Sequence, residues 1–550
     1  MKHSRIAIVA ALALLSSQAL AHHPSAGKIV PEDLAAGDHF GYAVDIDAGT
    51  AVASAPNHDE LAADAGAVYV YDRSGVFWNE QAKLFASNGA AGDYFGYAVA
   101  LDGDTLVVGA PFANPAASES GTAYIFVRSG SVWTEQAILA PSLAAADDHF
   151  GSAVSISGDT VIVGAPNRDR GMVTDAGAAF VFVRSGTVWT EEQKIQALDG
   201  APMDFFGTAV AVDANRALIG AVQGQGGSGN PDTGAAYLYE RTGTTWALAD
   251  KFADGDGATG DLYGAGVSVA GDWLSIGAPN NNAGGTNAGA AFMFQKVRGT
   301  WTLMNKRIGG EAGDKQGSST STVVSGYTVV GRSGDDEEAT NAGKMMLFTQ
   351  LPVPFTFEVY VSEEPVAEDQ LGNAVAIAED YWAIAGAFGH DDAGADAGSI
   401  DIFTVTRDPV HYCTAGISAS GCQATLEAMG VPCANADDGF IVEASNLEGQ
   451  KDGLYFFGTS GQQALPWGSG TSYRCVVPPT KRGGLIPGTG TIGMCDGLAS
   501  QDLNTRWYER PNQNPGPGAT VQIQFWYRDP QNTSNQTSSL SDAVQVILCP

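Results

Sequence analysis

The sequence predicts an all-β protein in which a seven-bladed β-propeller is followed by a disulfide-braced, β-sandwich-like domain. Two observations support this prediction: a segment of about 55 residues recurs seven times, and all six cysteines lie between Cys413 and Cys549. A segment that recurs at a fixed interval is usually one structural unit copied along the chain. The abrupt change in cysteine usage marks at least two parts, which we place at residues 22–408 and 409–550.

The repeat is plain in the stretches "DHFGYAVDIDAGTAVASAP" (38–56), "DYFGYAVALDGDTLVVGAP" (93–111) and "DHFGSAVSISGDTVIVGAP" (148–166). One glycine of each unit recurs at intervals of 53 to 57 residues. These repeat glycines are Gly41, Gly96, Gly151, Gly207, Gly264, Gly317 and Gly372. Units of this length suit a four-stranded propeller blade with long loops, and they are too long for leucine-rich or ankyrin repeats.

Each unit supplies four predicted strands. In the second unit, "GYAVALDG" and "TLVVGAP" form a hairpin, "TAYIFVRSG" follows Gly121, and "WTEQAILA" completes the blade. An aspartate precedes every repeat glycine by three places, at Asp38, Asp93, Asp148, Asp204, Asp261, Asp314 and Asp369. We interpret these aspartates as Asx-type caps of backbone N–H groups, with a cation-attracting ring of carboxylates as the alternative.

The two ends of the array predict how the ring closes. Residues 27–41 align without gaps on residues 82–96, whose first letters belong to a fourth strand, while the seventh unit ends after "AGSIDIFTV" (397–405) without one. We therefore predict that residues 28–31 form the outer strand of the seventh blade beside Ser399 to Val405. This pairing removes two exposed sheet edges.

The "FG" motif, followed thirteen residues later by the glycine of "GAP", resembles the FG-GAP repeat of integrin α-subunit propellers over residues 27 to 408. The resemblance implies an integrin-like propeller and suggests cell adhesion. Integrin-like repeats often place a D-x-D-x-D-G calcium loop between the first two strands. Here that connection is as short as Asp102-Gly103-Asp104, too short for the ligands that calcium needs. We expect no cofactor, although calcium at another place stays possible, and the metal content stays unknown.

The N-terminus predicts export. Residues 1–21 carry Lys2 and Arg5, an apolar run from Ile6 to Leu15, and a small-residue cleavage signal ending at Ala21, which is the pattern of a signal peptide. No later stretch has 18 uninterrupted apolar residues, so we expect no membrane span. We expect a mature chain that is secreted or held at the cell surface, in a Gram-negative-type bacterium.

The formal net charge of −33 excludes some partners. Nucleic acid and anionic membrane surfaces repel such an acidic protein, so we expect neither as a partner. The oligomeric state does not follow from the sequence.

The C-terminal part contains strand-like segments at 438–461, 521–530 and 541–549. An even number of cysteines in an exported protein indicates a disulfide framework, with 15 pairings open. The candidates are Cys413, Cys422, Cys433, Cys475, Cys495 and Cys549, of which we predict that Cys475 pairs with Cys495 across a Gly/Pro-rich loop. "KDGLYFFG" and "FWYRDPQNTSNQTSSLSDA" are similar to C-terminal modules of secreted bacterial repeat proteins. Trp467, Trp507, Trp526 and Tyr527 form either a sugar-binding platform or core.

Our leading functional hypothesis is an exported, non-enzymatic binding or adhesion protein whose propeller loops hold an extracellular protein or glycan. The loops between the second and third strands vary most between units, at 57–65, 112–120, 167–176, 223–233, 280–288, 333–342 and 389–397. The acidic residues of the last two predict ligand contacts: Asp335, Asp336, Glu337, Glu338, Asp391 and Asp392. We name no catalytic residue. The alternatives are an exported polysaccharide-acting enzyme on a propeller scaffold and a structural cell-surface component.

Overall fold

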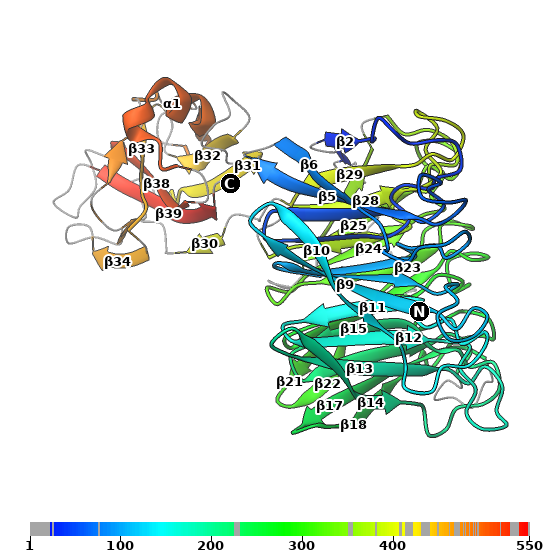
Figure 1. Ribbon diagram of the computed structural model, residues 1–550. Helices are drawn as coiled ribbons and strands as arrows, with labels where there is room; N and C mark the ends of the chain where they lie inside the picture. Colours follow the sequence, from blue (N-terminus) through cyan, green and yellow to red (C-terminus); the bar gives the residue numbers. More distant parts are fainter. Residues whose placement is uncertain are drawn as a thin grey trace, which may run out of the picture. The chain divides into compact units, whose positions relative to one another are not determined.

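The computed structural model describes two compact units that divide between Phe403 and Thr404 (Figure 1). In the first unit the described residues are 22–24, 27–74, 77–224, 232–349, 356–362, 364–379 and 382–403. In the second they are 404–405, 410–412, 422–430, 440–447, 450, 452–460, 462–466, 473–476, 478, 480–482, 485–487, 489, 491, 494–516, 519–528 and 538–547. The predicted signal peptide lies outside these residues.

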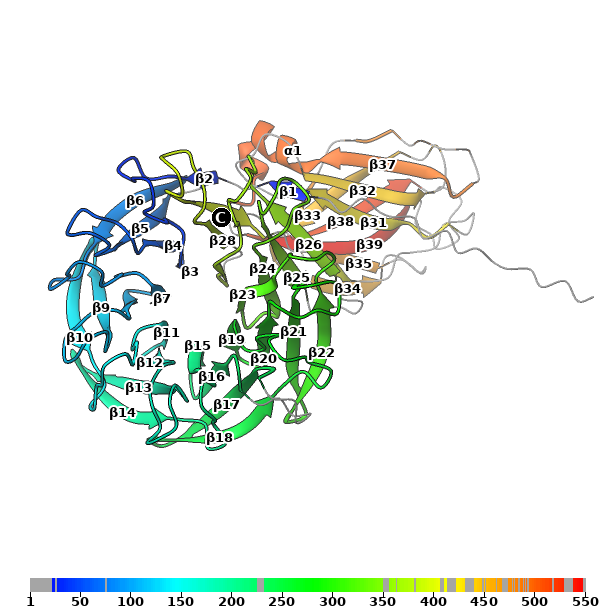
Figure 2. The ribbon, with the colours of Figure 1, turned by 90° about the vertical axis from the view of Figure 1, so that its right-hand side faces the viewer.

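The first unit is a ring of seven antiparallel sheets, as the sequence predicts (Figure 2). Blade one consists of β3(Val44–Asp47), β4(Thr50–Ala55), β5(Ala67–Ser74) and β6(Phe77–Leu84), and blade two of β7(Ala98–Asp102), β8(Thr105–Ala110), β9(Thr122–Ser129) and β10(Val132–Leu139). Blade three consists of β11(Ala153–Ser157), β12(Thr160–Ala165), β13(Ala178–Ser185) and β14(Val188–Ile195), and blade four of β15(Phe206–Asp213), β16(Arg216–Ala221), β17(Ala235–Thr242) and β18(Thr245–Phe252). Blade five consists of β19(Val267–Ala270), β20(Trp273–Ala278), β21(Ala290–Val297) and β22(Thr300–Ile308). Blade six consists of β23(Gln316–Thr322), β24(Tyr327–Arg332), β25(Lys344–Thr349) and β26(Thr356–Val361), and blade seven begins with β27(Val375–Ile377), β28(Trp382–Ala387) and β29(Ser399–Thr404).

The hydrophobic pattern of each strand follows its place in the blade. The second strand β8 is buried at every position, because sheets of both neighbouring blades cover it, and it reads as a continuous apolar run. The outer strand β10 is mostly solvent-facing and contains polar residues. The core lies between successive blades, where Val107 and Ile125 of blade two pack with Phe150 and Val163 of blade three.

The N-terminal segment closes the ring as predicted. Strand β2(Gly27–Ile29) pairs antiparallel with β29, with Lys28 opposite Asp401, and becomes the outer strand of blade seven. A further bridge joins Phe40 of blade one to Gly398 of blade seven. The sequence analysis did not predict β1(His22–Pro24), which pairs in parallel with β26 at the edge of blade six. Three residues are too few to show a strand periodicity.

Glycines join neighbouring blades at close backbone contacts. Gly121, which precedes the third strand of blade two, bridges Phe150 of blade three, and a Cβ at Gly121 would lie 2.1 Å from the Phe150 carbonyl oxygen. The repeat glycine Gly151 has φ +100°, and a Cβ there would lie 2.4 Å from the Thr122 oxygen. Both positions exclude larger residues, so these glycines serve the fold.

The seven repeat aspartates cap backbone groups, as we predicted. Asp148 is buried, and its carboxylate accepts a 2.7 Å hydrogen bond from the backbone N–H of Ala145, three residues earlier. The same bond recurs at Asp38, Asp93, Asp204, Asp261, Asp314 and Asp369, with distances between 2.7 and 3.0 Å. Because all seven make it, their recurrence belongs to folding.

The second unit is a two-sheet structure with a shared core. One sheet has the order β30(Val410–Tyr412), β39(Ser538–Ile547), β38(Thr520–Arg528), β33(Gly453–Gly458), β36(Lys481–Arg482), and the other has the order β31(Thr425–Gly430), β32(Phe440–Leu447), β37(Gly497–Asp502). A hairpin of β34(Gln462–Pro466) and β35(Tyr473–Val476), the helix α1(Leu503–Glu509) and the 3-10 turn η1(Pro511–Gln513) complete it. Trp507 and Tyr527 lie fully buried in the shared core, so neither forms a sugar-binding platform. Trp526 is partly buried against Phe456 and Leu540, and Trp467 lies outside the described residues.

The disulfide prediction for Cys495 is wrong. Cys495 pairs with Cys422, with a Cα–Cα distance of 5.3 Å across 73 residues of sequence. Strands β31 and β37 both pair antiparallel with β32, so they run parallel to one another and start at the same end of the sheet. The two cysteines precede these strands, and the sheet brings them together. Cys413, Cys433 and Cys549 lie outside the described residues, and the side chain of Cys475 is not described.

Candidate functional site: an aromatic pocket on blades one and two

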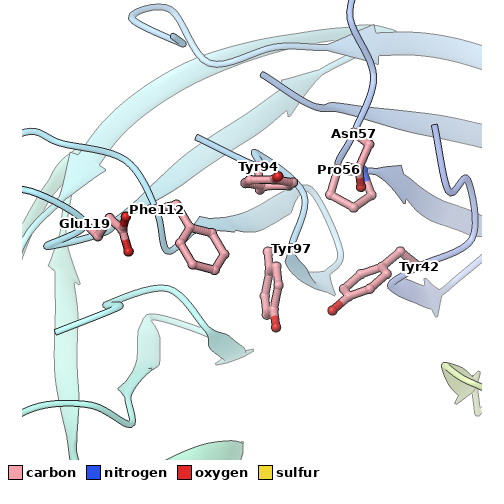
Figure 3. Close-up of a pocket in the computed structure, with 7 residues that line it drawn as sticks. All are labelled: Tyr42, Pro56, Asn57, Tyr94, Tyr97, Phe112 and Glu119. Carbon is pink, nitrogen blue, oxygen red and sulfur yellow. The ribbon is translucent and has the colours of Figure 1, made fainter. Parts of the chain in front are cut away.

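A pocket of about 440 Å³ lies beside the loops that follow the second strands of blades one and two (Figure 3). We call it the aromatic pocket and define it by its lining residues, Tyr42, Pro56, Asn57, Tyr94, Tyr97, Phe112 and Glu119. All of them come from blades one and two and the loops that follow their second strands. The volume falls in the range of small-ligand sites, and the lining combines aromatic rings with few polar groups.

The aromatic residues of the pocket break the repeat. Tyr42 and Tyr97 directly follow the repeat glycines of blades one and two. The residues at this place in the other five blades are small or polar: Ser152, Thr208, Ala265, Ser318 and Asn373. Phe112 follows the proline of "GAP", where blade one has Asn57 and blade three has Asn167. At the position after the repeat glycine, the repeat therefore carries a ring only in blades one and two.

The rings contact one another in a continuous series. Ring centroids lie 5.2 Å apart for Tyr42 and Tyr97, 5.9 Å for Tyr97 and Phe112, and 5.2 Å for Tyr94 and Phe112. The series continues to Phe388 of blade seven on one side, 6.0 Å from Tyr42, and to His149 of blade three on the other, 4.9 Å from Phe112. Edge and tilted contacts of this kind hold the rings in fixed orientations.

The backbone positions Tyr94 in a left-handed conformation. Its φ is +53°, and the residue two places before the repeat glycine has a positive φ in every blade, for example His39 at +56° and His149 at +52°. This conformation is a property of the repeat. What distinguishes this position in blade two is therefore the tyrosine side chain and not the backbone. Burial raises the pKa of Tyr94 and of Tyr42, which keeps both hydroxyls neutral.

Polar groups lie at the edge of the aromatic pocket. Glu119 Oε2 is 3.1 Å from His149 Nε2, and the Glu119 side chain is 47% exposed. The Asn57 side chain is already engaged, because its amide nitrogen donates to Asp64 at 2.9 Å and its oxygen lies 3.1 Å from His39 Nδ1. Glu119 is thus the one charged side chain among the residues that line the pocket.

The predicted acidic residues of blade six lie elsewhere and have protein partners. Asp335 is buried, with its carboxylate 3.0 Å from Lys344 Nζ and 3.1 Å from Arg332 Nε. Glu337 contacts the same lysine at 2.6 Å, and Glu338 is exposed. The ion pairs of Asp335 stabilise the loop and engage this buried carboxylate.

Two further predicted residues shape their loops. The Asp336 carboxylate accepts a hydrogen bond from the backbone N–H of Asn341 at 2.7 Å, and that of Asp391 accepts one from Asp396 at 2.9 Å. An Asp or Asn makes the corresponding bond in other blades, at Asp59, Asn114, Asp169 and Asn282. Asp392 lies 2.9 Å from the buried His390, whose hydrogen bond lowers the pKa of Asp392. A ligand-binding role for the six residues stays a prediction.

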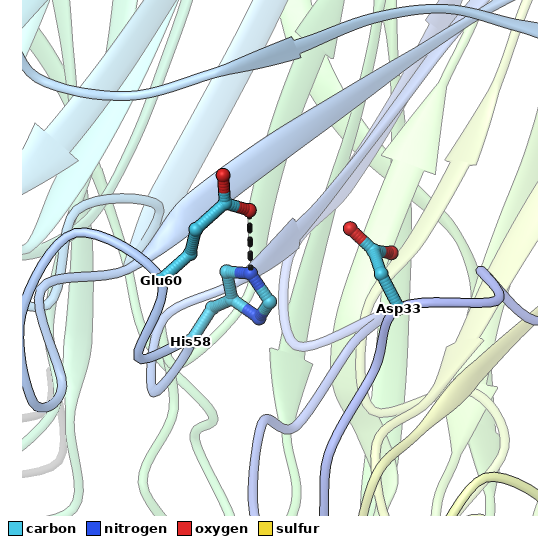
Figure 4. Close-up of side chains that lie close together, drawn as sticks. All are labelled: Asp33, His58 and Glu60. Carbon is cyan, nitrogen blue, oxygen red and sulfur yellow. Dashed lines mark ion pairs between the residues drawn. The ribbon is translucent and has the colours of Figure 1, made fainter.

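One group of side chains in the described residues has the composition of a metal site. Asp33, His58 and Glu60 bring ligand atoms within 4.8 Å of one another (Figure 4). Lys83 fills the space between them, with Nζ 2.6 Å from Asp33 Oδ2, 2.6 Å from His58 Nε2, and in contact with Glu60. Burial alone would raise the pKa of Asp33, but Lys83 lowers it overall. The lysine ammonium takes the place of a bound cation.

Comparison with protein families identifies the repeat. The family model described as the FG-GAP repeat matches five segments, residues 25–71, 78–126, 133–182, 189–239 and 246–294. These five segments of the chain are FG-GAP repeats. The segments run from the outer strand of one blade to the third strand of the next, which is the offset expected for a ring closed by its N-terminal strand. A search of curated proteins finds no match to this chain. Among the described residues, no helix has the length and apolar character needed to cross a membrane.

The sequence analysis missed the aromatic pocket of this FG-GAP propeller. It compared loops for variability and acidic content, whereas the pocket depends on residues that adjoin the most regular part of the repeat. A signal was present, because Tyr42 and Tyr97 are the only aromatic residues that directly follow a repeat glycine. Their proximity to Phe112 and Glu119 depends on how blades one and two pack, which the sequence does not show.

Proposed function

We propose that this FG-GAP protein is an exported, non-enzymatic binding protein that holds an extracellular protein or glycan at the aromatic pocket. The observation that carries the proposal is the replacement of small residues by rings on one part of a repeated face. A scaffold that repeats its strands and varies its surface separates folding from recognition. Large, oriented aromatic side chains are the residues that supply most binding energy in recognition sites.

The location and the partner are part of the same proposal. The N-terminal pattern of residues 1–21 supports export, and the mature protein is secreted or held at the surface of a Gram-negative-type bacterium. The acidic character of the chain supports partners that are neutral or positively charged. The adhesion role follows if the partner belongs to another cell or to the extracellular matrix.

An array of extracellular proteins and glycans tests the proposal. The mature full-length chain from residue 22 is applied beside a Tyr97→Ser variant, which carries the residue that blade three has at this place. A Phe77→Ser variant is the control, because Phe77 is 72% exposed on the outer strand of blade one, away from the pocket residues. We expect binding that Tyr97→Ser removes and Phe77→Ser keeps. Binding that is equal in all three proteins contradicts the proposal.

A further inference from the structure

The rings of the aromatic pocket meet at steep angles and do not lie in one plane. The interplanar angle is 50° between Tyr42 and Tyr97, 76° between Tyr97 and Phe112, and 66° between Tyr94 and Phe112. A flat sugar ring stacks best on a flat aromatic surface, which coplanar rings would provide. The angled rings in Figure 3 instead suit a rounded group, to which they can present both faces and edges.

The electrostatic character of the pocket is negative. The face of an aromatic ring carries a negative partial charge, which attracts cations within about 6 Å of the ring centre. Glu119 adds a formal negative charge at the edge, and the lining residues include no Lys or Arg. The charge of −33 on the whole chain adds a long-range attraction for cations.

Apart from the hydroxyls of Tyr42, Tyr94 and Tyr97, the pocket offers few hydrogen-bonding groups for a sugar. The Asn57 amide is engaged by Asp64 and His39, and one oxygen of Glu119, Oε2, lies 3.1 Å from His149 Nε2. A quaternary ammonium group needs no directional hydrogen bond, because its methyl groups contact the rings and its charge is spread over them. The available groups therefore suit an alkylated cation better than a polyhydroxylated ring.

We infer that the aromatic pocket binds a quaternary or methylated ammonium group, with Tyr42, Tyr97 and Phe112 around the methyl groups and Glu119 as the counter-charge. The inference rests on the proposed function and narrows it, because the extracellular protein or glycan would then carry this group. A methylated lysine side chain and a choline substituent on a glycan share the required chemistry. The cavity of about 440 Å³ is large enough to admit either.

Choline and its neutral isostere, 3,3-dimethyl-1-butanol, separate charge from shape. Titration calorimetry of the full mature chain with each probe, up to about 20 mM, measures the two affinities directly. We expect choline to bind at least about tenfold more tightly than the isostere, because only choline gains the cation–π and carboxylate attraction. Equal affinities overturn the inference, and so does the absence of choline binding over this range.

Two variants test whether Tyr97 and Glu119 contribute to choline binding. Tyr97→Ser removes one ring and should weaken choline binding at least about tenfold. Glu119→Gln keeps the shape of the side chain and should weaken choline binding about threefold to tenfold, while leaving the affinity for the isostere unchanged. Unchanged choline affinity in both variants places the binding elsewhere and overturns the inference. Thermal unfolding of each variant shows that the propeller still folds.

Phosphocholine and a peptide with one trimethyllysine distinguish the sources of the group. Tighter binding of the peptide than of its unmethylated form indicates a protein ligand, and tighter binding of phosphocholine indicates a glycan substituent. If choline fails but an array ligand still depends on Tyr97, the proposed function survives and the cation inference is wrong. If neither choline nor any array ligand depends on Tyr97, both are wrong.

Discussion

Blades one and two form one arc of the propeller face, and blades three to five form a second arc. The two arcs have the same backbone and different side chains. Blades one and two present Tyr42, Tyr97 and Phe112, whereas blades three to five present Ser152, Thr208 and Ala265 at the positions of the two tyrosines. The residue two places before the repeat glycine keeps its positive φ in both arcs, and the repeat aspartates keep their caps. The difference indicates that recognition lies where the repeat changes its side chains, while the unchanged parts serve the fold.

The first prediction asks whether both arcs depend on one closed scaffold. Deleting residues 22–36 removes β2 and opens the edge of β29, so the whole ring should lose stability, with a melting temperature lower by roughly 10 °C or more. Deleting residues 22–26 removes β1 alone and should cost less than half as much. A melting temperature that does not change on the larger deletion contradicts the closure of the ring by β2.

The second prediction compares a repeat aspartate in each arc. Asp148 of blade three is buried and forms an ion pair with the partly buried Arg168, so Asp148→Asn leaves this guanidinium without its counter-charge and should cost about 2–3 kcal/mol. Asp93 of blade two has Ala113 in place of the arginine, and burial raises the pKa of Asp93. Asp93→Asn should change stability by less than about 0.5 kcal/mol. Urea unfolding at pH 7.5 measures both, and equal costs contradict the comparison.

The third prediction concerns hydrogen bonds between inner strands. Asp45 of blade one accepts from Leu101 N at 2.7 Å, whereas in blade three the neutral Ser155 Oγ accepts from Val212 N at 3.0 Å. Burial raises the pKa of Asp45 from 3.8 to about 7. The folded state therefore holds this proton more tightly than the unfolded state, and stability falls as the pH rises from about 4 to about 7.

Asp45→Asn should remove this decrease in stability with rising pH. We expect the variant and the wild type to have the same free energy of unfolding at pH 4, and the variant to be more stable by about 1–2 kcal/mol at pH 8. Each pKa unit corresponds to about 1.4 kcal/mol, and we reduce this figure because solvent reaches the side chain. Ser155→Ala is the control, since its effect should not depend on pH. Urea unfolding at the two pH values checks this, and an Asp45→Asn effect that is independent of pH contradicts the prediction.

The fourth and smallest expected effect comes from introducing a tyrosine into blade three. Ser152 occupies in blade three the place of Tyr42 and Tyr97, and it is only partly buried. Ser152→Tyr should shift the melting temperature by no more than about 2 °C, because the backbone there already accepts tyrosine in two blades. Differential scanning calorimetry measures the shift. A large loss would show that the arcs differ in backbone room as well as in side chains.

Much of the fold could be predicted from the sequence because the repeat supplies the same information seven times. The spacing of the repeat glycines gives the number of blades, and the ungapped match of residues 27–41 to 82–96 gives the closing strand. The pairing of Cys422 with Cys495 could not be predicted, because it depends on β31 and β37 starting at the same end of one sheet. Cysteine spacing carries no information on that arrangement.

The candidate site was harder to predict for a related reason. Asp336 and Asp391 look like ligand contacts in a variable acidic loop, but each caps a backbone N–H five residues later, as Asp59 does in blade one. Asp335 is neutralised by Lys344, nine residues away in sequence and on the next strand. Acidic composition alone does not distinguish a carboxylate that shapes a loop from one that faces solvent.

The most direct measurement compares the contributions of the aromatic pocket and of the acidic loops to ligand binding. A Tyr42→Ser/Tyr97→Ser double variant and an Asp336→Asn/Asp392→Asn double variant are applied beside the wild type to one array of extracellular proteins and glycans. We predict that the tyrosine variant loses the wild-type ligand and that the aspartate variant keeps it. Loss of the ligand by the aspartate variant, with full binding by the tyrosine variant, would contradict recognition at the aromatic pocket.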